Sequence, residues 1–315
     1  MTTRPRIVCA VDFSESSRRA LRTAAMLAER FQSLLTVATV DDPLLATVNG
    51  AQYVRPEDST AHLLHRVVAE TIGDRLDGSE IEYIVGVGKP ADELLRIARD
   101  PRADLIVMSS HGLTGIRKLF FGSTAERVLR ESDIPVLVTE SAMPAPGSWA
   151  DLTGAVNRVL IPVDLLPGSE PQILGALRIA ETLGVPALVT HVIEPMRLPF
   201  AQRAKGLHID AERRARADQA IEAFLRSTPA PTRLEGLVAY GDPAEEIAKV
   251  ARDRHAGLIV MGLRAGDSPQ GRMGSVTYRV LCVSHAAVLA LPPSVRAIAD
   301  TATPPTTSAF MAMPA

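Results

Sequence analysis

A glycine-bearing loop between a buried strand and a helix start is the segment of this sequence best suited to chemistry. Leu105–Met108 is a short apolar run, typical of a strand buried on both faces of a parallel sheet. Small and polar residues follow, with glycines at positions 112, 115 and 122. Ser123 and Glu126 then form the S-x-x-E pattern of a capping box at a helix start. Backbone N–H groups of such a loop and of a first helical turn point outward, so the segment predicts an anion site. The competing interpretation is a glycine-bearing turn before an ordinarily capped helix.

Asp12 is the second candidate for ligand contact. It ends the apolar run Ile7–Val11, and its carboxylate accepts hydrogen bonds, which suits an amino or hydroxyl group of a ligand. Asp164 ends the similar run Val159–Val163. The alternative for Asp12 is an N-cap or an Asx turn before the serines that follow. His111 lies in the glycine-bearing loop and could touch an anion there, although a solvated loop histidine is the simpler interpretation.

Composition narrows the class of protein. The 315 residues have a formal net charge of −2, with acidic and basic residues interleaved, so we expect no nucleic-acid partner and no membrane insertion. The basic segment Arg213–Arg216 is flanked by acids and is interpreted as a solvated helix face. Cys9 and Cys282 lack metal-ligand spacing and are interpreted as small buried residues in a reducing compartment. No apolar run reaches the roughly 18 residues of a membrane span, and the N-terminus enters a strand at once, so a cytoplasmic location is expected.

The elements that position these residues alternate along the chain. Apolar runs predict strands at Ile7–Val11, Leu34–Val40, Ile81–Val87, Leu105–Met108 and Ile134–Val138. Helical periodicity predicts helices from the serines at 14, 16 and 17 to about Phe31, over Ser59–Leu76, over Ala91–Asp100 and from Ser123. This alternation predicts an α/β fold with a parallel sheet and helices on both faces. Ligands of such sheets bind at the carboxyl ends of strands, where the strand order reverses.

The chain then repeats itself. Val159–Asp164 matches Ile7–Asp12, Gly241–Ile247 matches Gly88–Leu94, and Gly274-Ser275 matches Gly122-Ser123, always 152 or 153 residues later. Chance would not produce a constant offset, so the sequence predicts a duplicated domain. We place the first domain at 1–140, a linker without sustained periodicity at 141–156, the second domain at 157–293 and a disordered tail at 294–315.

Two familiar nucleotide-binding patterns are excluded. Gly86–Ala91 fits G-x-G-x-x-A, but it follows the third predicted strand rather than the first, and Ala239 replaces Gly86 in the second half. We interpret it as a turn. No G-x-x-x-x-G-K-[ST] segment is present, which excludes a Walker-type NTPase. Neither half offers a clear nucleophile–base pair, paired carboxylates in one motif or clustered metal ligands, so fast hydrolysis is not expected.

Three segments of the first half resemble the universal stress protein family. They are Val11–Glu15, Gly88–Leu95, and Ser109–Gly112 separated by nine residues from Gly122-Ser123. With the duplication, the chain resembles a tandem member of that family over about residues 5–140 and 157–293. The resemblance implies two tandem Rossmann-like domains of the adenine nucleotide alpha hydrolase type, each a five-stranded parallel sheet with helices on both faces.

The resemblance also implies a nucleotide site in the first half. Members that bind ATP carry a glycine, two residues, a second glycine, nine residues, and then glycine with Ser or Thr. Gly112, Gly122 and Ser123 match this pattern, but Ser109 stands where the first glycine belongs, and its Cβ can tighten the loop. The family pattern further places Asp12 at the adenine or ribose end, backbone groups of Val40 at the base, and His111 beside the phosphates.

In the second half the corresponding positions are Asp164, Val192, Gly262, Gly274 and Ser275. The loop there is one residue shorter, with Ala265 at the aligned position of the second glycine. Arg264 could pair with phosphate or could point into solvent. Whether this half binds nucleotide is left open by the sequence.

The function expected from the resemblance is a cytoplasmic regulatory protein that holds ATP, with Mg²⁺ bridging the phosphates, and that does not turn it over rapidly. A slow ATPase on the same fold and a nucleotide-free interaction protein are the alternatives, because Ser109 and the altered second loop depart from the pattern. The expected partners are an adenine nucleotide, an unidentified protein and a second copy of the chain. The homodimer is expected because Ile134–Val138 and Ala287–Leu291 read as short apolar edge strands that invite pairing, of the halves and of chains.

Overall fold

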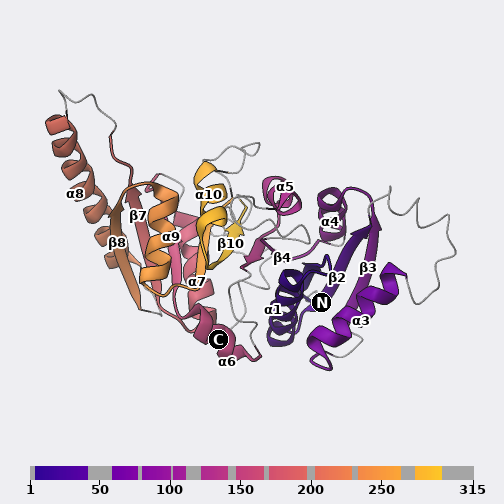
Figure 1. Cartoon of the computed structure of the whole chain (residues 1–315). Helices are drawn as coiled ribbons and strands as arrows, with labels where there is room; N and C mark the ends of the chain where they lie inside the picture. Colours follow the sequence, from indigo (N-terminus) through magenta and orange to yellow (C-terminus); the bar gives the residue numbers. More distant parts are fainter. Residues whose placement is uncertain are drawn as a thin grey trace. The chain divides into compact units, whose positions relative to one another are not determined.

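The computed structural model describes residues 4–41, 59–76, 80–100, 102–110, 122–140, 147–166, 170–196, 203–228, 233–263 and 274–292. His111 and Gly112 of the predicted site, and the predicted tail, lie outside these described residues. The chain divides into two compact units, one taking in the chain up to Ala155 and the other running from Val156 to Ala302 (Figure 1).

The first unit is built on one parallel sheet whose strands lie in the order β3-β2-β1-β4-β5. The strands are β1 (Arg6–Ala10), β2 (Leu34–Asp41), β3 (Ile81–Val87), β4 (Leu105–Ser109) and β5 (Val136–Thr139). The helices are α1 (Glu15–Phe31), α3 (Thr60–Ile72), α4 (Pro90–Arg99), α5 (Ser123–Glu131) and α6 (Trp149–Val156). Helix α1 packs with α3 and helix α4 with α5, and the two pairs cover different faces of the sheet (Figure 1).

The second unit repeats this order as β10-β9-β6-β7-β8, again parallel throughout. Its strands are β6 (Val159–Pro162), β7 (Ala187–Ile193), β8 (Leu234–Tyr240), β9 (Leu258–Gly262) and β10 (Ala287–Leu291). Its helices are α7 (Glu170–Leu183), α8 (Arg203–Ser227), α9 (Pro243–Asp253) and α10 (Ser275–Val283). The predicted α/β fold, with one five-stranded parallel sheet per half, is therefore confirmed.

The central strands are apolar without alternation because helices cover both of their faces. In β1, Ile7, Val8 and Cys9 are each at most 1% exposed, and Leu105–Val107 of β4 are equally buried. A strand with one wet face would show polar residues at every second position. The short unbroken apolar runs of β1 and β4 therefore indicate correctly that both faces of these strands are covered.

The stretch interpreted as an aperiodic linker contains helix α6, and that expectation is wrong for Trp149–Val156. The Ser148 Oγ accepts from the Asp151 N–H at 3.1 Å, and an Asp151 carboxylate oxygen accepts from the Gly147 N–H at 3.2 Å. This reciprocal capping resembles a capping box with Asp in place of Glu. The Trp149 ring meets Phe31 of α1 edge-on at 5.8 Å, and Leu152 is buried. Two apolar anchors thus stabilise a helix too short for its periodicity to be recognised.

The two cysteines differ, which corrects the prediction that both are buried. Cys9 lies in β1 with no exposed surface, and this burial raises the pKa of its thiol. Cys282 is partly exposed, because it lies on α10 beside the buried stripe formed by Val280 and Leu281 rather than within it.

In α8, the predicted solvated face is confirmed, since Arg214 and Arg216 are exposed and pair with acids one turn away.

Candidate functional site

The strand order places the predicted site residues at one edge of the first sheet. Strand β1 lies between β2 and β4, so the chain leaves β1 toward one side of the sheet and returns through β4 on the other. This is the reversal of strand order at which ligands of open α/β sheets bind. Asp12 follows β1, Val40 lies near the end of β2, and Ser109 ends β4. The carboxyl ends of three adjacent strands therefore bring these residues to the same edge.

Asp12 forms an Asx turn that starts helix α1. Its Oδ1 accepts from the Ser14 N–H at 3.1 Å and from the Ser14 hydroxyl at 2.6 Å. The Ser14 Oγ in turn accepts from the Ser17 N–H at 3.2 Å and is the N-cap of α1. The alternative interpretation of Asp12 as a turn residue is thus confirmed. The turn also holds the carboxylate in a fixed position at the carboxyl edge of the sheet.

The backbone of this turn is strained, and the strain is repeated in the second unit. Phe13 has φ 66° and Leu165 has φ 57°, and each follows the aspartate that ends its strand. The Asp164 Oδ1 accepts from the Leu166 N–H at 3.1 Å, as the Asp12 Oδ1 does from Ser14. Left-handed backbone costs a non-glycine residue about 1–2 kcal/mol, and such outliers gather at functional sites. Neither Phe nor Leu is a residue type that indicates left-handed backbone, so sequence reasoning missed these two residues.

Helix α5 begins differently from the sequence prediction. Its N-cap residue is Gly122, and Ser123 is the first helical residue rather than the cap. Glu126 is accordingly one position too late for a capping box, and its carboxylate pairs with Arg130 instead. The boundary is set by the Gly122 N–H, which donates to the Ser110 carbonyl at 3.2 Å and keeps Gly122 extended. The predicted capping box is therefore wrong.

The first turn of α5 faces the carboxyl edge of the sheet and has no capping side chain. The N-cap glycine has no side chain that could accept from the first-turn N–H groups, and Ser123 is exposed. In the second unit, Gly274 is the N-cap of α10, its N–H donates to the Leu263 carbonyl at 3.3 Å, and Ser275 is exposed. Both helix starts combine outward N–H groups with the positive end of the helix dipole, which suits an anion.

The end of β4 holds Ser109 and Ser110 in different environments. Ser110 is 2% exposed, its N–H donates to the Thr139 carbonyl at 3.2 Å, and its hydroxyl donates to a Glu140 carboxylate oxygen at 3.2 Å. Ser109 is half-buried as the last residue of the strand. The matching residue in the second unit is Gly262, whose carbonyl accepts from the Thr277 hydroxyl at 3.0 Å. Ser109 thus stands at the last position of β4, where the ATP-binding pattern of the family has glycine.

A glycine turn links each third strand to the helix beside the site. Gly88 has φ 148°, its N–H donates to the Asp41 carbonyl at 3.0 Å, and a Cβ there would lie 3.1 Å from the Glu93 Cγ. Gly241 repeats this turn with φ 150° and a Cβ position 2.8 Å from the Glu246 Cγ. Only glycine fits both the backbone angle and the space. The interpretation of Gly86–Ala91 as a turn is therefore confirmed at Gly88 and Lys89, while Gly86 lies in β3 and Ala91 in α4.

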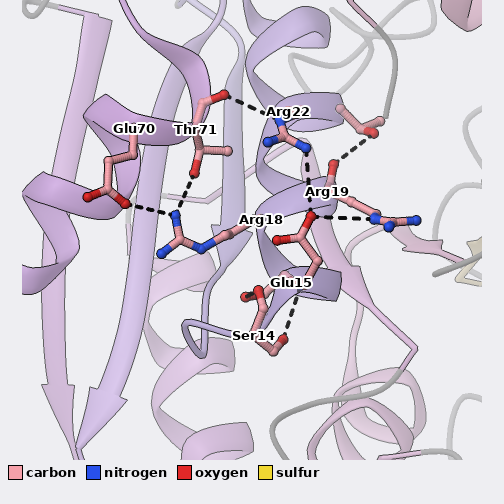
Figure 2. A network of polar contacts seen from close by, with 9 residues as sticks. Ser14, Glu15, Arg18, Arg19, Arg22, Glu70 and Thr71 are labelled. Carbon is pink, nitrogen blue, oxygen red and sulfur yellow. Dashed lines mark hydrogen bonds and ion pairs between the residues drawn. The ribbon is translucent and has the colours of Figure 1, made fainter. Parts of the chain in front are cut away.

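A polar network ties the start of α1 to helix α3 (Figure 2). The Arg18 guanidinium donates to a Glu70 carboxylate oxygen at 3.1 Å, and the Arg22 Nε donates to the Thr71 carbonyl at 3.4 Å. Glu15 lies 3.7 Å from the Arg19 guanidinium on the same helix. Exposed pairs of this kind contribute about 0.2–1 kcal/mol each. Together they hold the first turns of α1, and hence the Asp12 turn, against the neighbouring helix.

Within the described residues, no group of three or more His, Cys, Asp or Glu side chains could hold a metal ion. Nor is any helix of this described part both long and apolar enough to cross a membrane.

Val192 of β7 pairs with Ala239 of β8, as Val40 of β2 pairs with Gly86 of β3. The second unit thus has the same elements at its edge as the first.

Comparison with known proteins agrees with this architecture. The model of the Universal stress protein family matches residues 3–140 and again residues 155–292. A universal stress protein of Mycobacterium bovis is 24% identical over 288 residues, which covers 87% of this chain and 94% of that protein. The stress response protein NhaX of Bacillus subtilis is 29% identical over 164 residues, which covers 43% of this chain and 97% of that protein.

Solved structures show the same fold. A universal stress protein from Archaeoglobus fulgidus matches with a TM-score of 0.60 at 20% identity, covering 91% of this chain and 96% of that one. A functionally unknown protein from Pseudomonas aeruginosa matches with a TM-score of 0.63 at 18% identity, covering 95% of this chain and 96% of that one. With two matches to the family model that together span most of its length, this chain belongs to the universal stress protein family as a tandem, two-domain member.

Proposed function

We propose that this protein is a cytoplasmic, ATP-binding regulatory protein that holds its nucleotide without rapid turnover. ATP would lie across the carboxyl edge of the first sheet. The Asp12 carboxylate would accept from the adenine or ribose, and backbone groups at Val40 would meet the base. The N–H groups at the start of α5, beside Gly122 and Ser123, would bind the phosphates. Mg²⁺ would be held through the phosphates rather than by a dedicated set of protein ligands.

The observation that carries this proposal is the position of the α5 start. An uncapped helix N-terminus lies at the end of β4, tethered by the Gly122 N–H to the Ser110 carbonyl. Asp12 follows the adjacent strand β1, with a strained residue immediately after it. An anion-binding helix end and a hydrogen-bond acceptor on neighbouring strands fit the two ends of a nucleotide.

Binding rather than catalysis is proposed because the groups that would meet the phosphates are backbone donors. Such donors stabilise the ground state and the transition state of phosphoryl transfer alike, and uniform binding does not accelerate the chemical step. Rapid transfer also needs a group that orients the attacking nucleophile and a cation that meets the developing charge. The described residues at this edge, Asp12, Ser109 and Ser123, do not supply that combination.

The single most informative experiment is the nucleotide content of the purified chain. The protein is denatured, and the released small molecules are separated by chromatography with mass detection. Intact ATP at a substantial fraction of one equivalent per chain supports the proposal. Released ADP alone favours a slow ATPase. Absence of nucleotide, together with no calorimetric signal on ATP addition, favours a nucleotide-free interaction protein, the reading that Ser109 supports.

We also propose that chains associate as homodimers. The final strand of each unit is short and apolar, with Val136 and Val138 of β5 and every residue of β10 buried or nearly so. The proposal rests on the expectation from the sequence that these final strands pair, since an unpaired strand edge invites a partner strand. Static light scattering at micromolar concentration tests the proposal, and a mass of one chain throughout the concentration range contradicts it.

A further inference from the structure

The turn beside the phosphate-binding helix has opposite charge in the two units. Lys89 follows Gly88 and is the N-cap residue of α4, while Asp242 follows Gly241 and is the N-cap residue of α9. The glycine and proline on either side of each residue are the same in both units. The two turns therefore hold a lysine and an aspartate at equivalent places on the carboxyl edge.

This position lies against the helix that would bind the phosphates. In the second unit, the Asp242 Oδ2 accepts from the Arg279 guanidinium of α10 at 2.6 Å. The Asp242 Oδ1 meanwhile accepts from the Ala244 and Glu245 N–H groups at 3.1 and 3.2 Å, which caps α9. In the first unit, Arg127 of α5 reaches the first turn of α4 and lies 2.6 Å from an Asp92 carboxylate oxygen. In each unit, therefore, one ion pair joins α5 or α10 either to the turn residue or to the first turn of the helix that follows it.

Three matched positions differ in their summed charge between the two units. In the first unit Lys89 and Arg127 oppose Asp92, which gives 2 − 1 = +1. In the second unit Arg279 opposes Asp242 and Glu245, which gives 1 − 2 = −1. Arg127 also pairs with Glu131, but that residue ends α5, about 12 Å along the helix from Ser123. The hydrogen bond from Arg279 lowers the pKa of Asp242, so this carboxylate is charged at neutral pH.

We propose that the residue at this turn sets the phosphate charge that each site accepts: Lys89 favours a nucleoside triphosphate in the first unit, and Asp242 restricts the second unit to nucleosides with few or no phosphates. The inference rests on the proposed nucleotide sites and deepens them. A triphosphate with its several negative charges is attracted by the lysine and repelled by the aspartate, whereas an uncharged nucleoside is affected by neither. The two units are then unlike sites on the same backbone.

The test uses the full chain with ATP and adenosine as probes. Calorimetric titration measures affinities, and photo-crosslinking with 8-azido-ATP followed by peptide mapping assigns bound nucleotide to residues before or after the unit boundary. Lys89→Asp is expected to weaken ATP binding in the first unit by about threefold to tenfold at low salt, with Lys89→Gln between it and the wild type. Adenosine affinity is expected to stay unchanged. Adding 0.5 M NaCl shortens the Debye length to roughly 4 Å and is expected to shrink the difference in ATP affinity between the variant and the wild type.

Stability does not obscure this result. Lys89 makes no capping hydrogen bond, and aspartate is a preferred N-cap residue, so Lys89→Asp is expected to melt no lower than the wild type. Asp242→Asn keeps a capping oxygen and removes the charge, and it is expected to raise 8-azido-ATP labelling of the second unit. Asp253→Asn makes the same change at the far end of α9 and is the matched control.

The outcomes separate the inference from the proposed function. If the wild type binds neither ATP nor adenosine, the proposed sites are wrong and the inference falls with them. If the wild type binds ATP but Lys89→Asp and Asp242→Asn leave ATP affinity and labelling as they were, the inference alone is overturned. A loss that is equal for ATP and adenosine, or that is insensitive to salt, also overturns it, because it shows an effect on the shape of the site and not on its charge.

Discussion

The Gly122 N–H donates to the Ser110 carbonyl at 3.2 Å, and this bond joins the start of α5 to the end of β4. Gly122 has φ −58°, and a Cβ built on it would lie 3.5 Å from the same carbonyl oxygen. Both the backbone angle and the space are ordinary for alanine. The protein fold therefore accommodates a methyl group at this position, and the effects of Gly122→Ala report on the ligand.

Gly122→Ala is expected to reduce the amount of ATP bound by the protein more than Gly274→Ala does. The first loop keeps the nine-residue spacing of the family pattern, whereas the second loop is one residue shorter and departs from it. The two variants are compared by the nucleotide released on denaturation, with thermal melting as the control for folding. Equal losses from the two changes would show that the second unit contributes an equivalent phosphate site.

Asp12→Ala is expected to weaken ATP binding by about 0.5–1.5 kcal/mol, the usual contribution of one hydrogen bond. It is also expected to lower stability, because Phe13 at φ 66° depends on the Asx turn, in which the Asp12 carboxylate accepts a hydrogen bond from the Ser14 N–H. Asp12→Asn separates the two effects, since its side-chain oxygen can still accept from the Ser14 N–H. Calorimetric titration and chemical denaturation are measured on both variants, and an ATP affinity unaffected by Asp12→Ala would contradict the assigned role.

ATP mixed with the protein and Mg²⁺ is expected to remain largely intact, with turnover far below the roughly 1–10³ s⁻¹ typical of enzymes. Phosphate release is followed beside a calorimetric titration, so that binding and hydrolysis are measured in the same preparation. Release at several per second that is abolished by Ser123→Ala or by His111→Ala would establish an enzyme and end the proposal of a binding protein.

Tyr240→Phe is expected to destabilise the second unit at neutral pH. The Tyr240 hydroxyl donates to the Asp210 Oδ2 at 2.7 Å, and this bond, together with the Met196 N–H and Arg213, lowers the pKa of Asp210. A carboxyl whose folded pKa is depressed adds stability above its unfolded pKa and loses it as the pH falls through the folded pKa. The difference between wild type and variant should therefore be present at pH 7 and shrink below about pH 4.

Denaturant midpoints at several pH values measure this effect. Tyr83→Phe, which removes a hydroxyl from the ring that stacks on His65 in the first unit, is the control for losing a tyrosine hydroxyl. A destabilisation by Tyr240→Phe that stays constant from pH 7 to pH 3 would mean that the hydroxyl stabilises the protein independently of the Asp210 charge.

The local sequence pattern was sufficient to predict most of the strands and helices. The strands near Ile7 and Leu105 follow from unbroken apolar runs, because only a strand covered on both faces needs none of the polar residues of a wet face. The duplication follows from the constant offset between halves. The helix predicted over Ala91–Asp100 begins at Pro90, where a missing N–H is harmless.

Several features were decided by tertiary contacts instead. Helix α6 is anchored by the Trp149 ring on Phe31, which lies far away in the sequence, so the Pro- and Gly-containing composition of its surroundings misled the prediction. The start of α5 is moved to Ser123 by a bond between Gly122 and Ser110, where the S-x-x-E pattern had indicated a serine cap. Short patterns describe what a segment can do alone, and these segments are fixed by partners.

The candidate site divides in the same way. The sequence by itself determined which residues can accept or donate, since the carboxylate of Asp12 and the glycines at 122 and 274 are properties of residue type. Only the tertiary structure decided that Phe13 and Leu165 adopt left-handed backbone and that Arg127 and Arg279 reach the neighbouring helix turns. The two arginine contacts depend on the order of strands in the sheet, which brings together segments that no local pattern relates.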